Sequence, residues 1–368
     1  MRIARIDVFE VRYRHAEGPF AISGGRVSTE QDGTVVRVET DDGLVGWGEQ
    51  CVFTPSFLPG YGPSTRAVLA LLAPAVLGAD PRQVEVVYAR MDAAVKGYAY
   101  AKSALDIACW DLLGKATGLR VSDLLGGTQQ EEFPLYTGVG IARPGEMRQK
   151  CLEATAAGFR QIQLKAGTHW REDVERVEAC LEALAGAERV IVDANGYWPQ
   201  ADAIAFVAAV DALDLFIEQP CATVEECAQV RRGTRRPFVL DESLTHAVDI
   251  VRAHASGAVD AVRLKLSQFG GITPARRARD VAAALGLAMT IEDSGGGDIV
   301  TVAAAHLTCS VSPRLLLAGY LPSEMVAERI ASGTPVAAGG RTRLPTGAGL
   351  GIEVDESRLG EPVLRVQP

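Results

Sequence analysis

The sequence predicts an α/β protein in which a TIM-type (β/α)7-8 barrel follows an N-terminal α+β capping domain. Residues 1–130 begin with alternating strands and continue with helices, residues 131–320 alternate short apolar runs with amphipathic helices, and residues 321–368 resume no such period. A length of 368 residues, with 48% apolar and 23% charged residues, suits two ordered domains and excludes a disordered chain.

The capping domain is predicted over residues 1–130. The segments 3–10, 34–39 and 44–49 alternate apolar and polar residues as half-buried strands do, and Asp41-Asp42-Gly43 is a hairpin turn between the last two. Helical patterns follow at 64–75, 82–95 and 99–116. We expect the tail at 321–368 to return to this domain.

The barrel is predicted from eight short apolar runs with helical stretches between them. The runs occupy residues 133–138, 161–165, 190–193, 215–218, 238–241, 261–265, 288–291 and 314–317. Strands that alternate with helices form parallel βαβ units, and eight such units close into a barrel. An open, doubly wound sheet is the alternative.

Five consecutive runs end in a charged residue: Lys165, Asp193, Glu218, Asp241 and Lys265. Because they are one βα unit apart, we expect these side chains at the same mouth of the barrel, where barrel enzymes bind substrates. Three neighbouring carboxylates need a cation between them, and an all-oxygen ligand set favours Mg²⁺, with Mn²⁺ as a substitute. The alternative is a set of buried ion pairs that closes the top of the barrel.

The two lysines are expected on opposite sides of that metal, on the second and sixth strands. The chain has 37 Lys and Arg residues, but only six are Lys. A lysine whose pKa is lowered by its surroundings can act as a general base, whereas arginine stays protonated. We therefore expect Lys165 and Lys265 to move the α-proton of a carboxylate substrate through an electrostatically stabilised enolate.

The motifs around these residues resemble the enolase superfamily, in particular its mandelate racemase and muconate lactonizing branch. The matching segments are Val192-Asp193-Ala194-Asn195, Ile217-Glu218-Gln219-Pro220, Leu240-Asp241-Glu242-Ser243 and Lys265-Leu266-Ser267-Gln268-Phe269-Gly270-Gly271. The resemblance implies Asp193, Glu218 and Asp241 as Mg²⁺ ligands and Lys165 and Lys265 as acid/base catalysts, with loops near residues 20–30 and 50–60 closing over the substrate. We expect Asn195 and Glu242 beside them.

Departures from the family pattern bear on the substrate. Members of the muconate-lactonizing subgroup carry Lys-x-Lys on the second strand, whereas Gln163 stands first here. This Gln, with Glu292-Asp293-Ser294 after the seventh strand, is similar to hydroxyproline-betaine and proline-betaine epimerases and cis-3-hydroxy-L-proline dehydratases. Phe57 and Tyr320 are candidates for an aromatic cage around a quaternary ammonium. Gly296 stands where the betaine enzymes have Trp, and a smaller ammonium held by Asp293 tolerates this loss.

Four functions are therefore in competition. The first is a Mg²⁺-dependent racemase or epimerase of a proline-like amino acid or betaine, and the second is a dehydratase of the cis-3-hydroxy-L-proline type. The third is a muconate-type cycloisomerase. The fourth is a non-catalytic barrel that serves as a binding module.

Charge and cysteine content restrict partners and location. The formal net charge of −9 disfavours nucleic-acid binding, which requires basic patches, so a small-molecule carboxylate is the expected partner. The seven scattered cysteines include no C-x-x-C pair, and no apolar run has the length of a signal peptide or a membrane span. We expect a cytoplasmic protein without a membrane segment, and the family resemblance implies a homo-oligomer.

Overall fold

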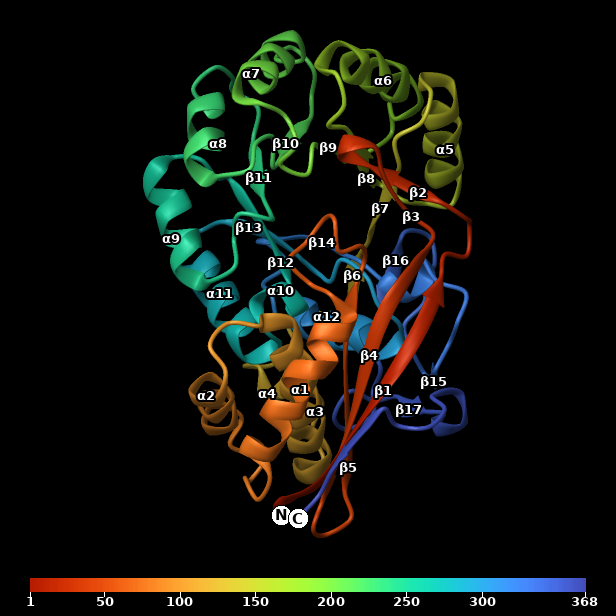
Figure 1. Ribbon diagram of the computed structural model, residues 1–368. Coiled ribbons are helices and arrows are strands. Elements are labelled where there is room, and N and C mark those ends of the chain that lie inside the picture. The colour runs from red at the N-terminus through yellow and green to blue at the C-terminus, as the bar shows by residue number, and fades with distance from the viewer.

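The computed structural model describes residues 1–368 and begins with an antiparallel sheet. This sheet is built from β1 (Ile3–Arg14), β4 (Glu30–Thr40) and β5 (Val45–Val52), with the final strand of the chain, β18 (Leu364–Val366), paired to β1. Both chain ends therefore lie side by side at the foot of the molecule (Figure 1). A small hairpin of β2 (Phe20–Ile22) and β3 (Arg26–Ser28), joined by the turn Ser23–Gly25, reaches over the barrel.

The helices of the capping domain follow this sheet in the chain. They are α1 (Gly62–Val76), α2 (Val84–Ala94), α3 (Ala99–Thr117) and the short α4 (Val121–Leu124). Two glycines of β5 allow α3 to lie close, since a Cβ at Gly48 would stand 1.8 Å from the Ala104 carbonyl oxygen and one at Gly46 would stand 2.4 Å from that of Ala108. A larger residue at either position would push the helix off the sheet.

The second domain is the predicted barrel of eight parallel strands. Its strands are β7 (Tyr136–Val139), β8 (Gln161–Lys165), β9 (Arg189–Asp193), β10 (Phe216–Glu218), β11 (Phe238–Leu240), β12 (Ala261–Lys265), β13 (Ala288–Glu292) and β14 (Leu316–Gly319). They are hydrogen-bonded in chain order, and a bridge between Leu135 and Gly319 joins the first strand to the last. The barrel prediction is thereby confirmed, and the open sheet is excluded.

Helices surround the barrel on its outer side (Figure 1). They are α5 (Pro144–Ala156), α6 (Trp170–Ala183), α7 (Gln200–Ala209), α8 (Val224–Arg231), α9 (Ala247–Ser256), α10 (Leu266–Phe269), α11 (Ile272–Ala284) and α12 (Asp298–Cys309). No helix of the chain combines the length and the apolarity that crossing a membrane requires.

Several predicted strand limits differ from the structure, and the clearest differences are at the first, fifth and last runs of the barrel. The first run divides into β6 (Glu132–Pro134) and β7, because β6 pairs with β16 (Arg341–Arg343) from the tail instead of joining the barrel. The last strand begins two residues later than predicted, at Leu316, and β11 ends at Leu240, one residue before Asp241. The rest of the tail contains β15 (Ala331–Ser332), which pairs with β17 (Glu353–Val354), and the turns Pro322–Glu324 and Glu356–Arg358.

The interior of the barrel changes from apolar to charged along the strands. A floor of Ile191, Val239, Ala261 and Leu317 closes the N-terminal end. Because alternate residues of a strand face the same side, the next inward positions on β9 and β12 are Asp193 and Arg263. The charged layers therefore rest on a packed apolar base.

One buried carboxylate joins the two domains. Glu49 of β5 accepts hydrogen bonds from the backbone N–H groups of Gly297 (2.8 Å), Ile299 (3.1 Å) and Val300 (2.9 Å). These groups belong to the N-terminus of α12, where a helix favours negative charge. The capping domain thus supplies the cap of the barrel helix that follows β13.

Candidate active site

The C-terminal ends of the barrel strands bring the five predicted charged residues to one mouth. Lys165, Asp193, Glu218 and Lys265 are the last residues of β8, β9, β10 and β12, and Asp241 directly follows β11. The side chains of the three acids and Lys265 are at most 4% exposed, whereas that of Lys165 is 13% exposed. Because β8 and β12 are four positions apart in the eight-stranded barrel, the two lysines approach from opposite sides.

Each predicted metal ligand is paired with polar groups of the protein. Lys165 Nζ lies 2.6 Å from Asp193 Oδ2, and Lys265 Nζ contacts Asp241 Oδ2. Gln163 Nε2 donates to Asp193 Oδ2 (3.1 Å) and to Glu218 Oε2 (2.9 Å). The Gln that departs from the family pattern therefore bridges two of the acids.

The pKa values follow from burial and from these pairs. Burial opposes ionisation of Asp193, but the neighbouring Lys165 ammonium outweighs it and lowers the pKa of that carboxyl. Burial raises the pKa of Glu218 to about 7 and also raises that of Asp241. Burial alone would lower the pKa of Lys265, but the surrounding carboxylates, Asp241 first among them, raise it. The lowered pKa expected for a basic lysine is therefore not found at Lys265, because acids surround its ammonium.

The fit of this donor set to a divalent cation can be judged from its oxygen atoms. No three His, Cys, Asp or Glu side chains lie close enough together to hold a metal ion in the conformations shown. The predicted ligands instead pair with Lys165, Arg263 and Lys265. Asp241 Oδ1 and Glu242 Oε2, however, are buried oxygens without a hydrogen-bond partner, and buried polar groups require one. Hard carboxylate oxygens with free lone pairs fit Mg²⁺, with Asp193, Glu218 and Asp241 as the residues that would hold it.

Asn195 and Glu242 lie beside the first of these acids. Asn195 Nδ2 donates to Asp193 Oδ2 (2.8 Å) and to Glu242 Oε1 (3.0 Å). Burial raises the pKa of Glu242 well above its usual range. Asn195 therefore bridges Asp193 and Glu242.

A pocket of about 470 Å³, partly open to solvent, lies above these charges. Seven of the predicted residues line this pocket, and so do residues that the sequence alone does not place in the site. The predicted residues are Phe57, Gln163, Lys165, Asp241, Lys265, Asp293 and Tyr320, and the others include Phe20, Ile22, Phe53, Tyr136, Glu292, Ser294 and Met325. Asp193, Glu218, Asn195 and Glu242 are not among the lining residues.

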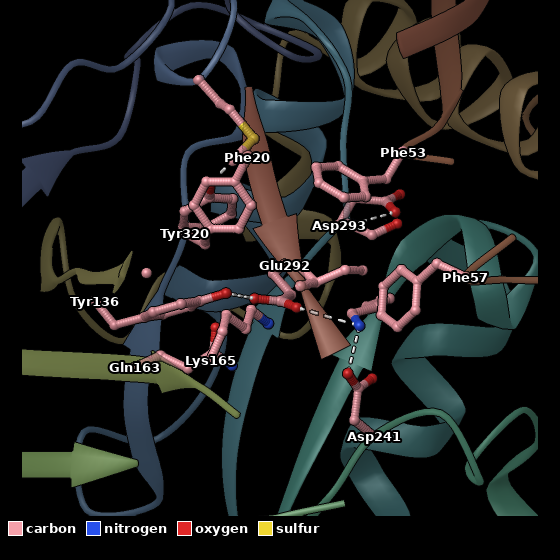
Figure 2. A pocket seen from close by; sticks show the side chains of 15 residues that line it. Phe20, Phe53, Phe57, Tyr136, Gln163, Lys165, Asp241, Glu292, Asp293 and Tyr320 are labelled. Atoms are coloured by element: carbon pink, nitrogen blue, oxygen red, sulfur yellow. Dashed lines mark hydrogen bonds and ion pairs between the residues drawn. The ribbon is translucent and has the colours of Figure 1, made fainter. Parts of the chain in front are cut away.

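The two aromatic candidates lie on different sides of this pocket (Figure 2). The Phe57 ring centroid is 5.3 Å from Lys265 Nζ, whereas Tyr320 stacks on Tyr136 with a centroid separation of 5.0 Å. Both rings line the pocket, and a cage around a quaternary ammonium stays a prediction. Gly296 is not among the lining residues.

Asp293 is fixed by the backbone around it. Its two carboxylate oxygens accept hydrogen bonds from the N–H groups of Ser267 and Ser294, each at 2.8 Å. Burial raises the pKa of Asp293 to about 6, so the carboxylate is mostly ionised at neutral pH. A buried, ionised acid at the pocket wall suits an ammonium group of a ligand.

Arg263 and Tyr136 are site residues that the sequence analysis missed. Arg263 stands two residues before Lys265 on β12, so strand alternation turns both side chains into the barrel. Its guanidinium carbon lies 4.6 Å from the Tyr136 ring centroid, and Tyr136 donates its hydroxyl hydrogen to Glu292 Oε2. The signal for Arg263 was the period-2 pattern, whereas nothing local marks Tyr136.

Two loops of the capping domain meet over the mouth at Arg26. Arg26 Nε donates to the Ser23 carbonyl oxygen (2.8 Å) and Nη1 donates to that of Ser56 (3.2 Å). Its guanidinium carbon also lies 5.3 Å from the Phe57 ring centroid and 5.9 Å from that of Tyr197, which belongs to the loop after β9. One arginine therefore links both capping loops to the rim of the barrel.

Comparison with known proteins agrees with this architecture. Residues 4–126 match the N-terminal domain of mandelate racemase / muconate lactonizing enzyme, and residues 146–358 match the enolase C-terminal domain-like family. A cis-3-hydroxy-L-proline dehydratase of Roseibium aggregatum is 41% identical, with 99% of this chain and 100% of that protein covered. An N-succinyl-L-Arg/Lys racemase of Bacillus cereus is 29% identical, with 98% of each chain covered.

Solved structures give the same result. A crystal structure of a mandelate racemase/muconate lactonizing enzyme from Roseovarius nubinhibens, complexed with magnesium, superposes with a TM-score of 0.96 at 35% identity and covers 100% of both chains. The curated relatives include a dehydratase, a racemase, an epimerase and cycloisomerases, so this protein is an enzyme of the isomerase or lyase class. The chain belongs to the mandelate racemase and muconate lactonizing enzyme family of the enolase superfamily.

Proposed function

We propose that the protein removes water from a proline-like amino acid that carries a hydroxyl group on the carbon next to the α-carbon. The observation that carries this proposal is the position of Lys165 and Lys265, on opposite strands of one barrel and both lining one pocket. The 41% identity to a cis-3-hydroxy-L-proline dehydratase supports dehydration as the first candidate. The sequence motifs alone favour epimerisation over dehydration.

The stereochemistry of such a substrate suits two lysines on opposite faces. In a cis-3-hydroxyproline the hydroxyl and the carboxylate share one face of the ring, so the α-hydrogen lies on the other face. One lysine, as the free amine, takes the α-proton, and the electrons of the C–H bond form the C=C bond as the C–O bond breaks. The second lysine, as the ammonium, donates a proton to the departing hydroxyl, which leaves as water, and the enamine product tautomerises to a cyclic imine.

The other polar residues would position the substrate. Asp293 would bind the ring ammonium, since its carboxylate lies in the pocket wall between two backbone N–H donors. A Mg²⁺ ion held by Asp193, Glu218 and Asp241 would stabilise the negative charge that develops on the substrate carboxylate. Phe57, Tyr136 and Tyr320 would exclude water from the ring.

Epimerisation at the α-carbon is the second candidate. A substrate without a hydroxyl group to expel would lose its α-proton to one lysine and regain a proton from the other. The racemase relative and the same pair of opposed lysines favour this alternative.

Proton NMR in D₂O would separate the two. The protein is incubated with cis-3-hydroxy-L-proline and, separately, with L-proline and its betaine, in the presence of Mg²⁺. We expect loss of the hydroxyl with formation of a cyclic imine from the first compound, and no activity in Lys165→Ala or Lys265→Ala. Incorporation of α-deuterium without loss of the hydroxyl would favour epimerisation, and full activity in both variants would contradict either reaction.

Metal dependence is tested in the same assay. EDTA should abolish turnover, and added Mg²⁺, with Mn²⁺ as the substitute, should restore it. Turnover that is indifferent to EDTA would contradict the role assigned to the three acids.

We also propose that the enzyme is a cytoplasmic homo-oligomer. All seven cysteines are buried and free, as expected in a reducing compartment. Leu71 of α1 and Val86 of α2 are 62% and 47% exposed, which leaves apolar surface on the capping helices. A monomeric mass in light scattering would contradict the oligomer.

A further inference from the structure

A buried arginine crosses the barrel beneath the candidate active site. The Arg263 side chain is 1% exposed, and it meets acids from two other strands. Its Nε lies 2.6 Å from Glu218 Oε1, its Nη2 donates to Glu218 Oε2 (2.6 Å), and its Nη1 donates to Glu292 Oε2 (2.8 Å). With the Tyr136 ring 4.6 Å away, this one side chain on β12 contacts residues of β10, β13 and β7.

Arg263 holds Glu218 by one hydrogen bond, from Nη2 to Oε2, and by the ion pair between Nε and Oε1. With Nη2 and Nη1 the rigid guanidinium reaches Glu218 and Glu292 at the same time, which a lysine ammonium on a flexible stem does not reproduce. Glu218 Oε1 has no hydrogen-bond partner, so its lone pairs are available to a further cation. Gln163 Nε2 also donates to Oε2, at 2.9 Å. The orientation of Glu218 is therefore set from below before any ligand arrives.

The contact to Glu292 connects Arg263 to the wall of the pocket. Glu292 Oε2 accepts from both Arg263 and Tyr136, which leaves Oε1 facing Lys265 Nζ at 3.8 Å (Figure 2). The Tyr136 ring, which contacts both the Arg263 guanidinium and the Tyr320 ring, lines the pocket itself. A shift of Arg263 would move Glu218 and Tyr136 together.

We propose that Arg263 is a positioning residue that prepares Glu218 for a divalent cation and holds the Tyr136 side of the substrate pocket. This inference rests on the proposed metal site. It predicts that a loss of the planar guanidinium weakens the binding of the metal alone, before any substrate or turnover is involved. Partners that orient a metal ligand are worth about 10- to 100-fold in metal affinity.

The test compares two buried arginines by Mg²⁺ titration calorimetry of the metal-free protein. Arg263→Lys keeps the charge but loses the planar guanidinium that donates to both Glu218 and Glu292, and it should bind Mg²⁺ about 10- to 100-fold more weakly than the wild type. The matched control is Arg279→Lys. Arg279 is also buried, at 8% exposed, but it donates to the Leu125 carbonyl oxygen and to Ser310 Oγ, away from the site. The control should lower the thermal unfolding midpoint without changing the Mg²⁺ affinity.

The outcomes distinguish this inference from the proposed function. Wild-type Mg²⁺ affinity in Arg263→Lys would overturn the role of Arg263 and leave the metal site standing. Absence of Mg²⁺ binding by the wild type would overturn both. If Arg263→Lys does not fold, the pair Arg263→Met with Glu292→Gln, which removes one charge of each sign, takes its place and should show the same weakened binding. A variant whose KM for the amino acid rises while its Mg²⁺ affinity is unchanged would also count against the metal role.

Discussion

Gln163 and Arg263 lie beneath the charged strand ends and contact the acids of the site. Each stands two residues before a lysine of the site, so each turns into the barrel one layer below it. Gln163 bridges Asp193 and Glu218, and Arg263 bridges Glu218 and Glu292. Strand alternation predicts their direction, but their acid partners come from other strands, which only a closed barrel brings near.

His306 supplies a prediction for a single residue outside the site. Its Nδ1 accepts from the backbone N–H of Ser122 (3.2 Å), and its Nε2 lies 3.1 Å from the Leu350 carbonyl oxygen, so the neutral ring satisfies both. Burial lowers the pKa of His306 from 6.5 to about 4. On acidification, His306 therefore binds a proton at a higher pH in the unfolded chain than in the folded protein. The stability that the neutral ring contributes is complete above pH 6.5 and is lost as the pH falls towards 4.

Urea unfolding between pH 7 and pH 4 would measure this loss. The free energy of unfolding of the wild type should fall by on the order of 3 kcal/mol more than that of His306→Gln over this range. His254→Gln, at an exposed position of α9, is the control and should follow the wild type. Identical slopes for His306→Gln and the wild type would show that His306 does not titrate in this way.

Among the elements, the hairpin β2–β3 and the loop after β5 act on the site without belonging to the barrel. Gly24 of the hairpin turn donates its N–H to the Gly167 carbonyl oxygen (2.9 Å) in the loop after β8. The loop after β5 contributes Phe53 and Phe57 to the pocket. Arg26 joins the two segments, so their positions over the mouth depend on each other.

Arg26→Met should therefore weaken catalysis while leaving the fold intact. Cation–π contacts are worth about 0.5–2 kcal/mol, which converts to roughly a 3- to 30-fold lower kcat/KM, with most of the change in KM. Limited proteolysis should also cut the 53–61 segment faster. Arg231→Met is the matched control, because Arg231 lies over the Phe238 ring at the opposite end of the barrel. An unchanged kcat/KM in Arg26→Met would refute the link.

At the scale of the whole molecule, Glu49 links the capping domain to the barrel. Its carboxylate caps α12 from the sheet of the capping domain, and Tyr13 of the same sheet donates its hydroxyl hydrogen to Glu49 Oε1. Burial raises the pKa of Glu49 from 4.5 to about 7. The folded protein thus keeps this proton after the unfolded chain has released it. The contribution of Glu49 to stability is present below pH 4.5 and is lost as the pH rises through about 7.

The sign of this dependence is opposite to that at His306, and it can be measured separately. Between pH 5 and pH 8 the free energy of unfolding of the wild type should fall by on the order of 3 kcal/mol relative to Glu49→Gln. Glu361→Gln, at an exposed position near the chain end, should show the wild-type slope. A parallel course of Glu49→Gln and the wild type would contradict the raised pKa.

The sequence by itself determined the barrel, its five charged strand ends and the family. Hydrophobic periodicity and the regular interval of one βα unit are local properties of the sequence. They can be recognised without knowing which distant residues are in contact. Only the tertiary structure decided that β6 leaves the barrel for β16, that Arg263 meets Glu292, and that Glu49 caps α12. Each of these pairs joins residues far apart in the chain, and no local pattern encodes which distant partner burial will bring into contact.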